Sequence, residues 1–247
     1  SFYLAPRMPR LRQAFPDIRI ELVIERHLIN LTRREADISL SFAELQGPRL
    51  IAEKIGTFVL NLYASPAYVA RMGMPASIAD LERHEFVDYI DDMVVIQAVR
   101  WLHDVITPSR VVFQSSSMVA HQNAAAAGMG IAILPTFTAA EDTRLSALLP
   151  AEASVQRPIW LTMHEDHQYL GRMKAVRRFL KGIVAEDQAF LNGQRQLHLS
   201  RHRLELERHG KNSTRALRRR RGDGALSDSA AHIVQFFPGG GRHGGRR

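Results

Sequence analysis

Apolar and polar positions follow two different periods near the start of the chain. Apolar residues recur at helical spacing from Leu4 to Phe15, where a Pro-Asp pair ends the pattern. From Ile18 to Ile24, apolar and charged residues alternate, which predicts a strand with one covered face. The region therefore predicts a helix followed by a half-buried strand.

The same two periods recur along the chain as far as residue 187. The predicted strands are 36–41, 50–55, 58–64, 86–90, 111–113, 131–134 and 157–164, with Gly56 separating the second from the third. The predicted helices are 30–34, 65–71, 94–105, 117–127, 137–141, 145–149 and 170–183. Strands that alternate with helices predict an α/β fold with mostly parallel sheets.

Three consecutive hydroxyl residues, Ser115-Ser116-Ser117, precede the helix expected at 117–127. The segment continues through Gly128 and Gly130 into a short apolar strand that ends at Pro135. Hydroxyl side chains in this position satisfy the first N–H groups of a helix, and the same helix end attracts anions. The serines are therefore an ordinary N-cap or part of a cradle for a small molecule, and three in a row favour the cradle.

The charge of the chain is concentrated at its C-terminal end. The net charge is +8, but residues 194–247 contain 13 Lys/Arg and 4 Asp/Glu, whereas residues 1–193 contain 20 and 21. The first 193 residues therefore have no basic surface typical of nucleic-acid binding. Like-charge blocks such as Arg218 to Arg221, together with glycine-rich ends, predict a basic, disordered or non-native tail over 194–247. A frameshift or readthrough is the first interpretation of this tail, and a genuine basic arm is the second.

Composition restricts the chemistry and the compartment. The 247 residues are 45% hydrophobic, which is enough for a sizeable core, and they include no cysteine. Disulfides and thiolate metal sites are excluded. No apolar run is long enough for a membrane span, and the N-terminus lacks the layout of a secretory signal. We expect a cytoplasmic protein with no membrane partner.

Other candidate motifs do not indicate catalysis. His164-Glu165-Asp166-His167 lacks the helical spacing of a zinc-protease motif and is interpreted as a solvated loop. Gly128-x-Gly130 lacks the third glycine of a dinucleotide fingerprint, and no serine lies in a G-x-S-x-G elbow. We therefore expect no enzyme activity, no cofactor and no metal site.

Short segments in a fixed order run through residues 1–187. They are FPDI from Phe15, READISL from Arg34, YASPAY from Tyr63, DLERH from Asp80 and AGMGIAILP from Ala127. Together these segments resemble the effector-binding domain of LysR-type transcriptional regulators. The ordered set is more specific than any one of its members.

The resemblance implies a type II periplasmic-binding-protein-like fold, in which two α/β subdomains are joined by two crossover strands. Subdomain I would comprise 1–64 plus 159–187, and subdomain II would comprise 65–158. The crossovers would lie near 60–65 and 159–163. The ligand would bind in the cleft between the subdomains, as is typical of sheets whose strands end at a shared crevice.

The resemblance also assigns residues to that cleft. The candidate ligand-binding residues are Ser41, Phe42, Ser65, Asp88, Tyr89, Ser115, Ser116, Ser117, Ile133 and Pro135. Each of them can instead be a cap, a turn or a core contact. Ser116 and Ser117 are the strongest candidates, because their hydroxyls would act together with the helix N–H groups on a polar or anionic ligand.

The implied function is that of an effector-binding and oligomerisation domain of a bacterial transcription regulator, with a small polar or anionic metabolite as its effector. We expect this chain to lack the family's winged helix-turn-helix and to have a truncated first strand of the effector domain, so DNA would be contacted only through the absent N-terminal domain. A homodimer or tetramer is implied, with the helix near 4–15 of one protomer against the 117–127 helix of another. The apolar residues on these two helices, Leu4, Met8, Leu11, Ala120, Ala124 and Ala127, fit either that contact or burial within one protomer.

Two other classes of protein remain open. A solute-binding protein of a transport system with the same fold is the main alternative, and it would need an export signal and a complete first strand. An enzyme that uses the same cleft would need a converging acid, base or nucleophile, and the sequence provides no such set.

Overall fold

The computed structural model describes residues 2–25, 36–90, 101–139, 141–194 and 229–236. The strands are β1 (Ile18–Glu25), β2 (Ile38–Ser41), β3 (Leu50–Ala64), β4 (Phe86–Asp88), β5 (Val111–Gln114), β6 (Ile131–Pro135), β7 (Ser146–Leu148), β8 (Val155–His164) and β9 (Ser229–Phe236). The α-helices are α1 (Met8–Ala14), α2 (Pro66–Met72), α3 (Met118–Ala126), α4 (Thr136–Ala139), α5 (Gly171–Glu186) and α6 (Gln188–Leu191). Short 3-10 helices are η1 (Ala5–Arg7), η3 (Ala79–Arg83), η6 (Trp101–Asp104) and η7 (Glu165–Tyr169).

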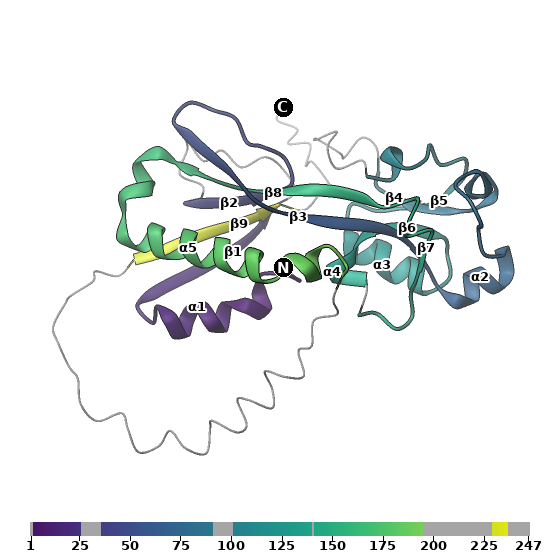
Figure 1. The fold of residues 1–247 in the computed structure, drawn as a ribbon, viewed down its shortest axis with the longest axis horizontal. Helices are drawn as coiled ribbons and strands as arrows, with labels where there is room; N and C mark the ends of the chain where they lie inside the picture. The colour runs from purple at the N-terminus through teal and green to yellow at the C-terminus, as the bar shows by residue number, and fades with distance from the viewer. Residues whose placement is uncertain (1, 26–35, 91–100, 140, 195–228, 237–247) are drawn as a thin grey trace, which may run out of the picture.

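Two α/β subdomains share one hydrogen-bonded sheet in the order β1-β9-β2-β8-β3-β6-β4-β5, with β7 paired to β3 off this path. Lobe I contains β1, β9, β2 and the C-terminal half of β8, with α1, α5 and α6 beside them. Lobe II contains β4 to β7 with α2, α3 and α4. Figure 1 shows the long strands β3 and β8 running from one lobe toward the other. The ladder is continuous because these two crossover strands contribute to both lobes.

The register shows where each crossover strand changes lobe. β3 pairs with β8 from Leu50 to Leu60 and with β6 and β7 from Leu60 to Ala64. β8 pairs with β2 only from Trp160 to Met163, so its connecting part is 155–159. The part of β3 opposite it is 56–60. These two segments meet the crossovers expected at 60–65 and 159–163 only at their ends. The division of the chain at residues 64 and 158 stays a prediction.

A single strand, β3, replaces the two strands predicted on either side of Gly56. The register shifts between Lys54 and Gly56, but pairing with β8 continues on both sides. A Cβ at Gly56 would overlap the Val184 side chain and lie 2.8 Å from Gln188 Oε1. The glycine therefore marks a close approach of α5 and α6 to the strand, rather than a turn.

Two expectations for the C-terminal part of the chain are wrong. Residues 146–148, predicted as helical, form β7, because they pair with the edge of β3 through Leu62 and Leu148. The tail was expected to lack ordered elements, but β9 runs parallel to both β1 and β2 and lies between them. A strand in this position satisfies backbone groups of both neighbours, which the average composition of a charged tail does not reveal. The helices predicted at 30–34 and over most of 94–105 lie outside the described residues.

One hydrophobic core extends through both lobes, from Leu4 and Ile38 through Leu60 to Phe86 and Leu102. Helix α5 buries Met173, Val176, Leu180, Ile183 and Val184, which lie close to the predicted face. Full burial of a side chain of this size stabilises the fold by about 1.5–3 kcal/mol relative to exposure. Leu4 and Leu11 belong to the protomer's own interior, being 0% and 1% exposed, so neither is available for the predicted contact with another protomer. No helix in the described part of the chain is both long and apolar enough to cross a bilayer.

Candidate functional site

The ends of two parallel strands bring the central sequence candidates together. Asp88 at the end of β4 pairs with Gln114 at the end of β5. The Ser115 backbone N–H donates to the Asp88 carbonyl oxygen at 3.1 Å, and Gln114 Nε2 donates to the Tyr89 carbonyl oxygen at 3.1 Å. Asp88, Tyr89 and the serine triplet therefore share one edge of lobe II, as expected for neighbouring parallel strands.

The serine triplet forms the turn from β5 into α3. The Ser115 hydroxyl accepts a hydrogen bond from the Ser117 backbone N–H at 3.1 Å, and the Ser115 carbonyl oxygen lies 2.9 Å from His121 Nε2. Ser117 occupies the N-cap position of α3, but its side chain makes no capping hydrogen bond. All three serines are half-buried. Ser115 thus shapes the turn, whereas the Ser117 hydroxyl lies at the helix end without capping it.

His121 and Tyr89 form the buried floor beneath this turn. Their ring centroids are 4.3 Å apart at an interplanar angle of 74°. Burial lowers the pKa of His121 below its ordinary value, although the hydrogen bond to Ser115 opposes that shift. Burial raises the pKa of Tyr89, with Asp88 adding to the effect. The Tyr89 hydroxyl is buried and has no hydrogen-bond partner among the residues that the structure describes. The floor is therefore neutral and carries one unsatisfied hydroxyl.

Asp88 is the acidic group of this site and is 7% exposed. Its Oδ1 accepts a hydrogen bond from the Tyr89 backbone N–H at 2.8 Å, and its Oδ2 lies 3.6 Å from His103 Nε2. His103 belongs to η6, which also carries Trp101. Asp88 therefore connects the serine edge to the neighbouring aromatic residues.

Aromatic rings fill the space between the lobes beside this edge. We call Tyr3, Phe42, Phe58, Tyr89, Trp101 and Phe137 the interlobe aromatic cluster. Phe42, which follows β2 in lobe I, lies 4.7 Å from Phe58 of β3 and 5.7 Å from Trp101, measured between ring centroids. Trp101 in turn lies 6.4 Å from Tyr89. The cluster therefore forms a continuous path of rings from lobe I to the serine edge.

The other sequence candidates have local structural roles. The Ser41 hydroxyl donates to the Ala43 carbonyl oxygen at 2.7 Å, and the Ser65 hydroxyl accepts from the Tyr68 backbone N–H at 3.2 Å as the N-cap of α2. Ile133 and Pro135 pair with Leu62 and Leu60 in the centre of the sheet. The structure thus brings Phe42, Asp88, Tyr89 and the serine triplet to one region, and places the other four in a turn, a cap and a strand. The ligand roles stay predictions.

Sequence reasoning missed His121 and most of the aromatic cluster. His121 could have been found from the sequence, because it follows Ser117 by one turn of the predicted helix. In the structure its backbone N–H donates to the Ser117 carbonyl oxygen. Phe58, Trp101 and Phe137 come from separate segments, and nothing in their local patterns indicates that they meet. Their proximity is visible only in the folded structure.

The described residues include no cluster of three or more groups suited to a metal ion. The histidines of the 164–167 segment lie near carboxylates, with His164 Nδ1 3.4 Å from Asp166 Oδ2 and His167 Nδ1 3.5 Å from Asp37 Oδ1. Arg49 also pairs with Glu165 and Asp166 of this segment. The segment is therefore part of an ion-paired surface.

Two α/β lobes joined by two crossover strands define the class of fold to which the chain belongs. Residues 1–185 match the LysR substrate binding domain, and the chain belongs to that family. This is a family of transcriptional regulators rather than enzymes, and the match does not favour a transport protein.

Individual relatives agree with this assignment. The chain is 30% identical over 156 residues to an uncharacterised HTH-type transcriptional regulator of Haemophilus influenzae, covering 60% of this chain and 53% of that protein. It is also 30% identical over 152 residues to the HTH-type transcriptional regulator CrgA of Neisseria meningitidis serogroup C, covering 60% and 50%. The chain thus spans about half the length of these curated relatives. The CrgA regulatory domain of Neisseria meningitidis, a solved structure, superposes with a TM-score of 0.61 and 27% identity, covering 75% of this chain and 92% of that one.

Proposed function

We propose that this chain is the effector-binding and oligomerisation part of a bacterial LysR-type transcription regulator. A small polar or anionic metabolite binds between the lobes and controls a DNA-binding domain of the same regulator in the cytoplasm. Family membership supports this proposal, because the matching relatives carry the name of HTH-type transcriptional regulators. The observation that carries it is the meeting of Asp88, Tyr89 and the serine triplet beside the interlobe aromatic cluster.

The N-terminus of α3 suits the acidic or polar end of a ligand. The backbone N–H groups of its first turn and the hydroxyls of Ser116 and Ser117 lie at the positive end of the helix dipole. Asp88 lies on the neighbouring strand end and would accept a hydrogen bond from a donor on the same ligand. A metabolite that carries both a carboxylate and a hydroxyl or amino donor fits these groups best.

The aromatic cluster gives a mechanism for transmitting the signal. Each aromatic pair contributes about 0.5–1.5 kcal/mol beyond the burial of its surface. A ligand that enters beside Trp101 must repack ring contacts that join lobe I to lobe II. Binding then changes the relative stability of two lobe arrangements, which is the condition for a ligand to shift their populations.

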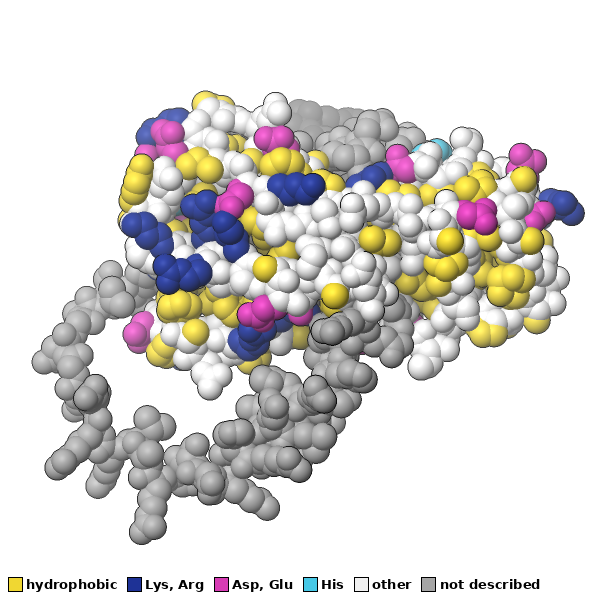
Figure 2. All heavy atoms as spheres, in the orientation of Figure 1, with side chains coloured by type: hydrophobic (Ala, Val, Ile, Leu, Met, Phe, Trp, Pro, Cys, Tyr) yellow, Lys and Arg dark blue, Asp and Glu magenta, His cyan; other side chains and the backbone are white. Residues whose placement is uncertain are grey.

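Lobe II offers a surface for assembly with a second copy of the chain. Figure 2 shows apolar side chains gathered over the half that contains α2 and α3, whereas basic side chains gather over α5. Val119 of α3 and Met129 just after it are 45% and 44% exposed. Because Leu4 and Leu11 of the first helical region are buried, the α3 side of the proposed antiparallel contact would be the apolar one. Analytical ultracentrifugation of the chain should show a dimer that Val119→Glu weakens.

A binding screen tests the proposed effector site. Thermal unfolding of the full chain with a library of small carboxylates and amino acids should identify a ligand that raises the melting temperature. Alanine at both Ser116 and Ser117 should weaken the binding of that ligand by roughly thirtyfold, since each hydroxyl contributes a hydrogen bond of about 1 kcal/mol.

Ser109→Ala is the matched control, because this exposed serine donates only to the Glu82 carbonyl oxygen. If every hit binds the double variant and the folded wild-type protein equally well, the serine turn is not the effector site.

A further inference from the structure

The short helix η6 lies against the two strands that join the lobes. Phe58 of β3 and Arg157 of β8 are partners in the ladder, in the middle of the connecting segments 56–60 and 155–159. The Phe58 ring centroid is 6.0 Å from that of Trp101 at the start of η6. Arg157 Nη2 donates a hydrogen bond to Asp104 Oδ2 at the end of η6. One rung of the crossover therefore contacts both ends of this helix.

The first half of η6 is anchored in the interior. Trp101 and Leu102 are both buried. The Trp101 ring meets Phe42 of lobe I and Tyr89 of lobe II edge to face, with centroids 5.7 Å and 6.4 Å away. The indole thus touches a residue of each lobe as well as the strand between them. A change in the position of η6 alters contacts with both lobes.

The second half of η6 reaches the proposed effector site. His103 Nε2 lies 3.6 Å from Asp88 Oδ2, the carboxylate at the end of β4. Asp88 is buried, whereas His103 is exposed. A ligand group that donates a hydrogen bond to Asp88 Oδ2 therefore competes with His103 for the same atom. Occupancy of the site is linked in this way to the position of η6.

The ion pair at the end of η6 is weak enough to open and close. Asp104 is exposed and Arg157 is half-buried. Ion pairs near the surface contribute little to stability, because solvent screens the charges in both states. Opening this pair therefore changes the contact between η6 and β8 without unfolding either lobe.

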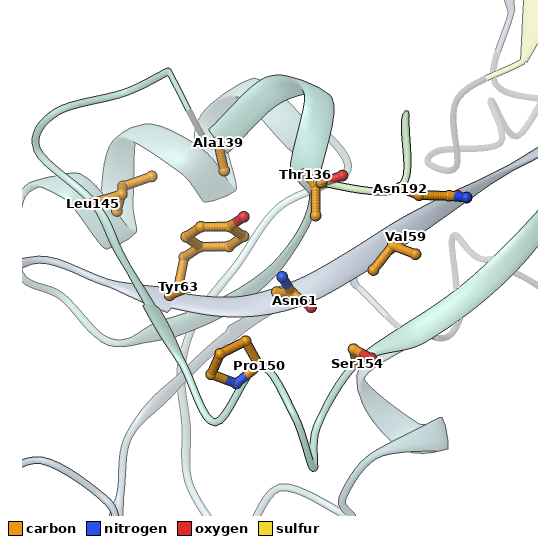
Figure 3. Close-up of a pocket in the computed structure, with 11 residues that line it drawn as sticks. Val59, Asn61, Tyr63, Thr136, Ala139, Leu145, Pro150, Ser154 and Asn192 are labelled. Atoms are coloured by element: carbon orange, nitrogen blue, oxygen red, sulfur yellow. The ribbon is translucent and has the colours of Figure 1, made fainter. Parts of the chain in front are cut away.

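The contacts of η6 with the crossover lie on one face of β3. Successive side chains of a strand point to opposite faces, so Val59 and Asn61 lie on the face away from Phe58. Figure 3 shows these two residues beside Thr136 and Asn192, around a hollow on that other face. No residue of η6 belongs to the lining of this hollow. The link from Asp88 to Arg157 is therefore confined to the face that carries the interlobe aromatic cluster.

We propose that the contacts of His103 with Asp88 and of Asp104 with Arg157 form a latch, which regulates the arrangement of the lobes. This inference rests on the function proposed above. A ligand donor that binds Asp88 displaces His103, η6 tilts about its buried residues, and the pair of Asp104 with Arg157 opens at the crossover. The carboxylate of the effector then provides affinity at the serine turn, whereas its hydroxyl or amino donor provides the signal. A carboxylate without such a donor occupies the turn and leaves the latch closed.

The latch can be opened without a ligand. His103→Ala removes the contact with Asp88, and Arg157→Gln removes the ion pair with Asp104. In the full chain, each change should speed hydrogen exchange of the paired amides in 155–159 by about fivefold, as expected for the loss of one exposed pair. The double variant should also be about fivefold faster, rather than roughly twenty-fivefold, because both changes open one latch. The Trp101 indole resonance in ¹⁵N NMR spectra should move to the same new position in all three variants.

Two further variants separate the ion pair from general packing. Arg144→Gln is the matched control, because it removes the exposed pair with Asp142 in lobe II and should leave exchange in 155–159 unchanged. Arg157→Lys should retain wild-type exchange, since its ammonium group can still pair with Asp104. Asp104→Asn tests the same pair if Arg157→Gln does not fold.

Either of two results would overturn the latch. The first is an unchanged Trp101 resonance and unchanged exchange in 155–159 in His103→Ala, and the second is multiplication of the two effects in the double variant. Because these measurements use no ligand, they can fail while the serine turn still binds its effector. Equally, the absence of any ligand at the serine turn would leave the result for the latch unaffected.

Discussion

The His121 and Tyr89 rings meet edge to face, 4.3 Å apart, beneath the turn formed by the serine triplet. His121 is 2% exposed and its ring nitrogen lies 2.9 Å from the Ser115 carbonyl oxygen. The imidazole therefore holds the turn through a hydrogen bond while its ring packs on the tyrosine. The groups that face it are Tyr89, the backbone of Ser115 and the nearby Asp88, which lies within reach of His103.

The free energy of unfolding should fall at acidic pH, where the His121 ring becomes protonated on both nitrogens. The pKa of His121 is lower in the folded protein than in the unfolded chain. Its contribution to the free energy of unfolding is therefore fully present above the unfolded pKa of about 6.5 and is lost as the pH falls below that value. The melting temperature of wild type should decrease from pH 8 to pH 5. This group lowers the free energy of unfolding by at most about 1.4 kcal/mol per pH unit.

The His121→Gln variant should show a smaller decrease over the same range. His84 also has a pKa lowered by burial, so His84→Gln should remove a separate part of the slope. An unchanged slope in His121→Gln would contradict the assignment of a neutral, buried imidazole.

Asp187→Ala should be one of the most destabilising single changes in lobe I. Asp187 Oδ2 accepts from Arg7 Nε at 2.5 Å and from the Tyr3 hydroxyl at 3.1 Å, and the Arg7 side chain is 8% exposed. Removal of the carboxylate leaves a buried guanidinium without its partner, which costs about 3–5 kcal/mol. Urea unfolding measures this loss.

The neighbouring ion pair is the control for that change. Glu186 pairs with Arg10 at 2.7 Å, but both side chains are exposed. Glu186→Ala should cost between about 0 and 1 kcal/mol, as is typical of surface pairs. Similar losses in the two variants would mean that the Arg7 pair is effectively solvated.

Gly56→Ala should destabilise the contact of β3 with α5 and α6. The added methyl group would overlap Val184, and overpacking of this kind costs about 1–3 kcal/mol. Gly182→Ala should have the opposite effect, because the space around Gly182 in α5 is open and alanine favours the helix by about 0.5–1 kcal/mol. Denaturant midpoints of the two variants on either side of wild type would support this account, and a stabilising Gly56→Ala would refute it.

Strand β9 should contribute to the order of lobe I. Val234→Pro removes a backbone donor from a strand that has neighbours on both edges, where proline is strongly disfavoured. Hydrogen exchange in β1 and β2 should become faster in this variant, whereas a chain shortened after Phe236 should retain wild-type protection. If Val234→Pro leaves exchange in both strands unchanged, the tail does not pair there in solution.

Much of the fold could be predicted because its signals are local. Alternation from Ile18 onward indicated β1, and the small-residue segment after the serine triplet indicated α3 and β6 within one or two residues. The family resemblance placed Asp88 and Ser115 in one cleft, and they meet because Asp88 ends β4 and Ser115 directly follows the parallel strand β5.

Other features depend on contacts between distant segments. Strand β9 was not predicted because its short apolar run lies within a tail whose charge dominates the composition. Leu148 was assigned to a helix because three residues give no usable period, and only pairing with Leu62 makes them a strand. The ring path through Phe58 and Trp101 joins residues more than 40 positions apart in the sequence. Local pattern carries no information about such contacts.

The central claim is that an effector binds at the turn between β5 and α3. Its most direct test is a ¹⁵N NMR titration of the full chain with the strongest hit from the thermal screen. We expect the largest saturable shifts at the backbone amides of Ser116, Ser117 and Met118 and at Tyr89. Shifts confined to residues away from this turn would contradict the claim.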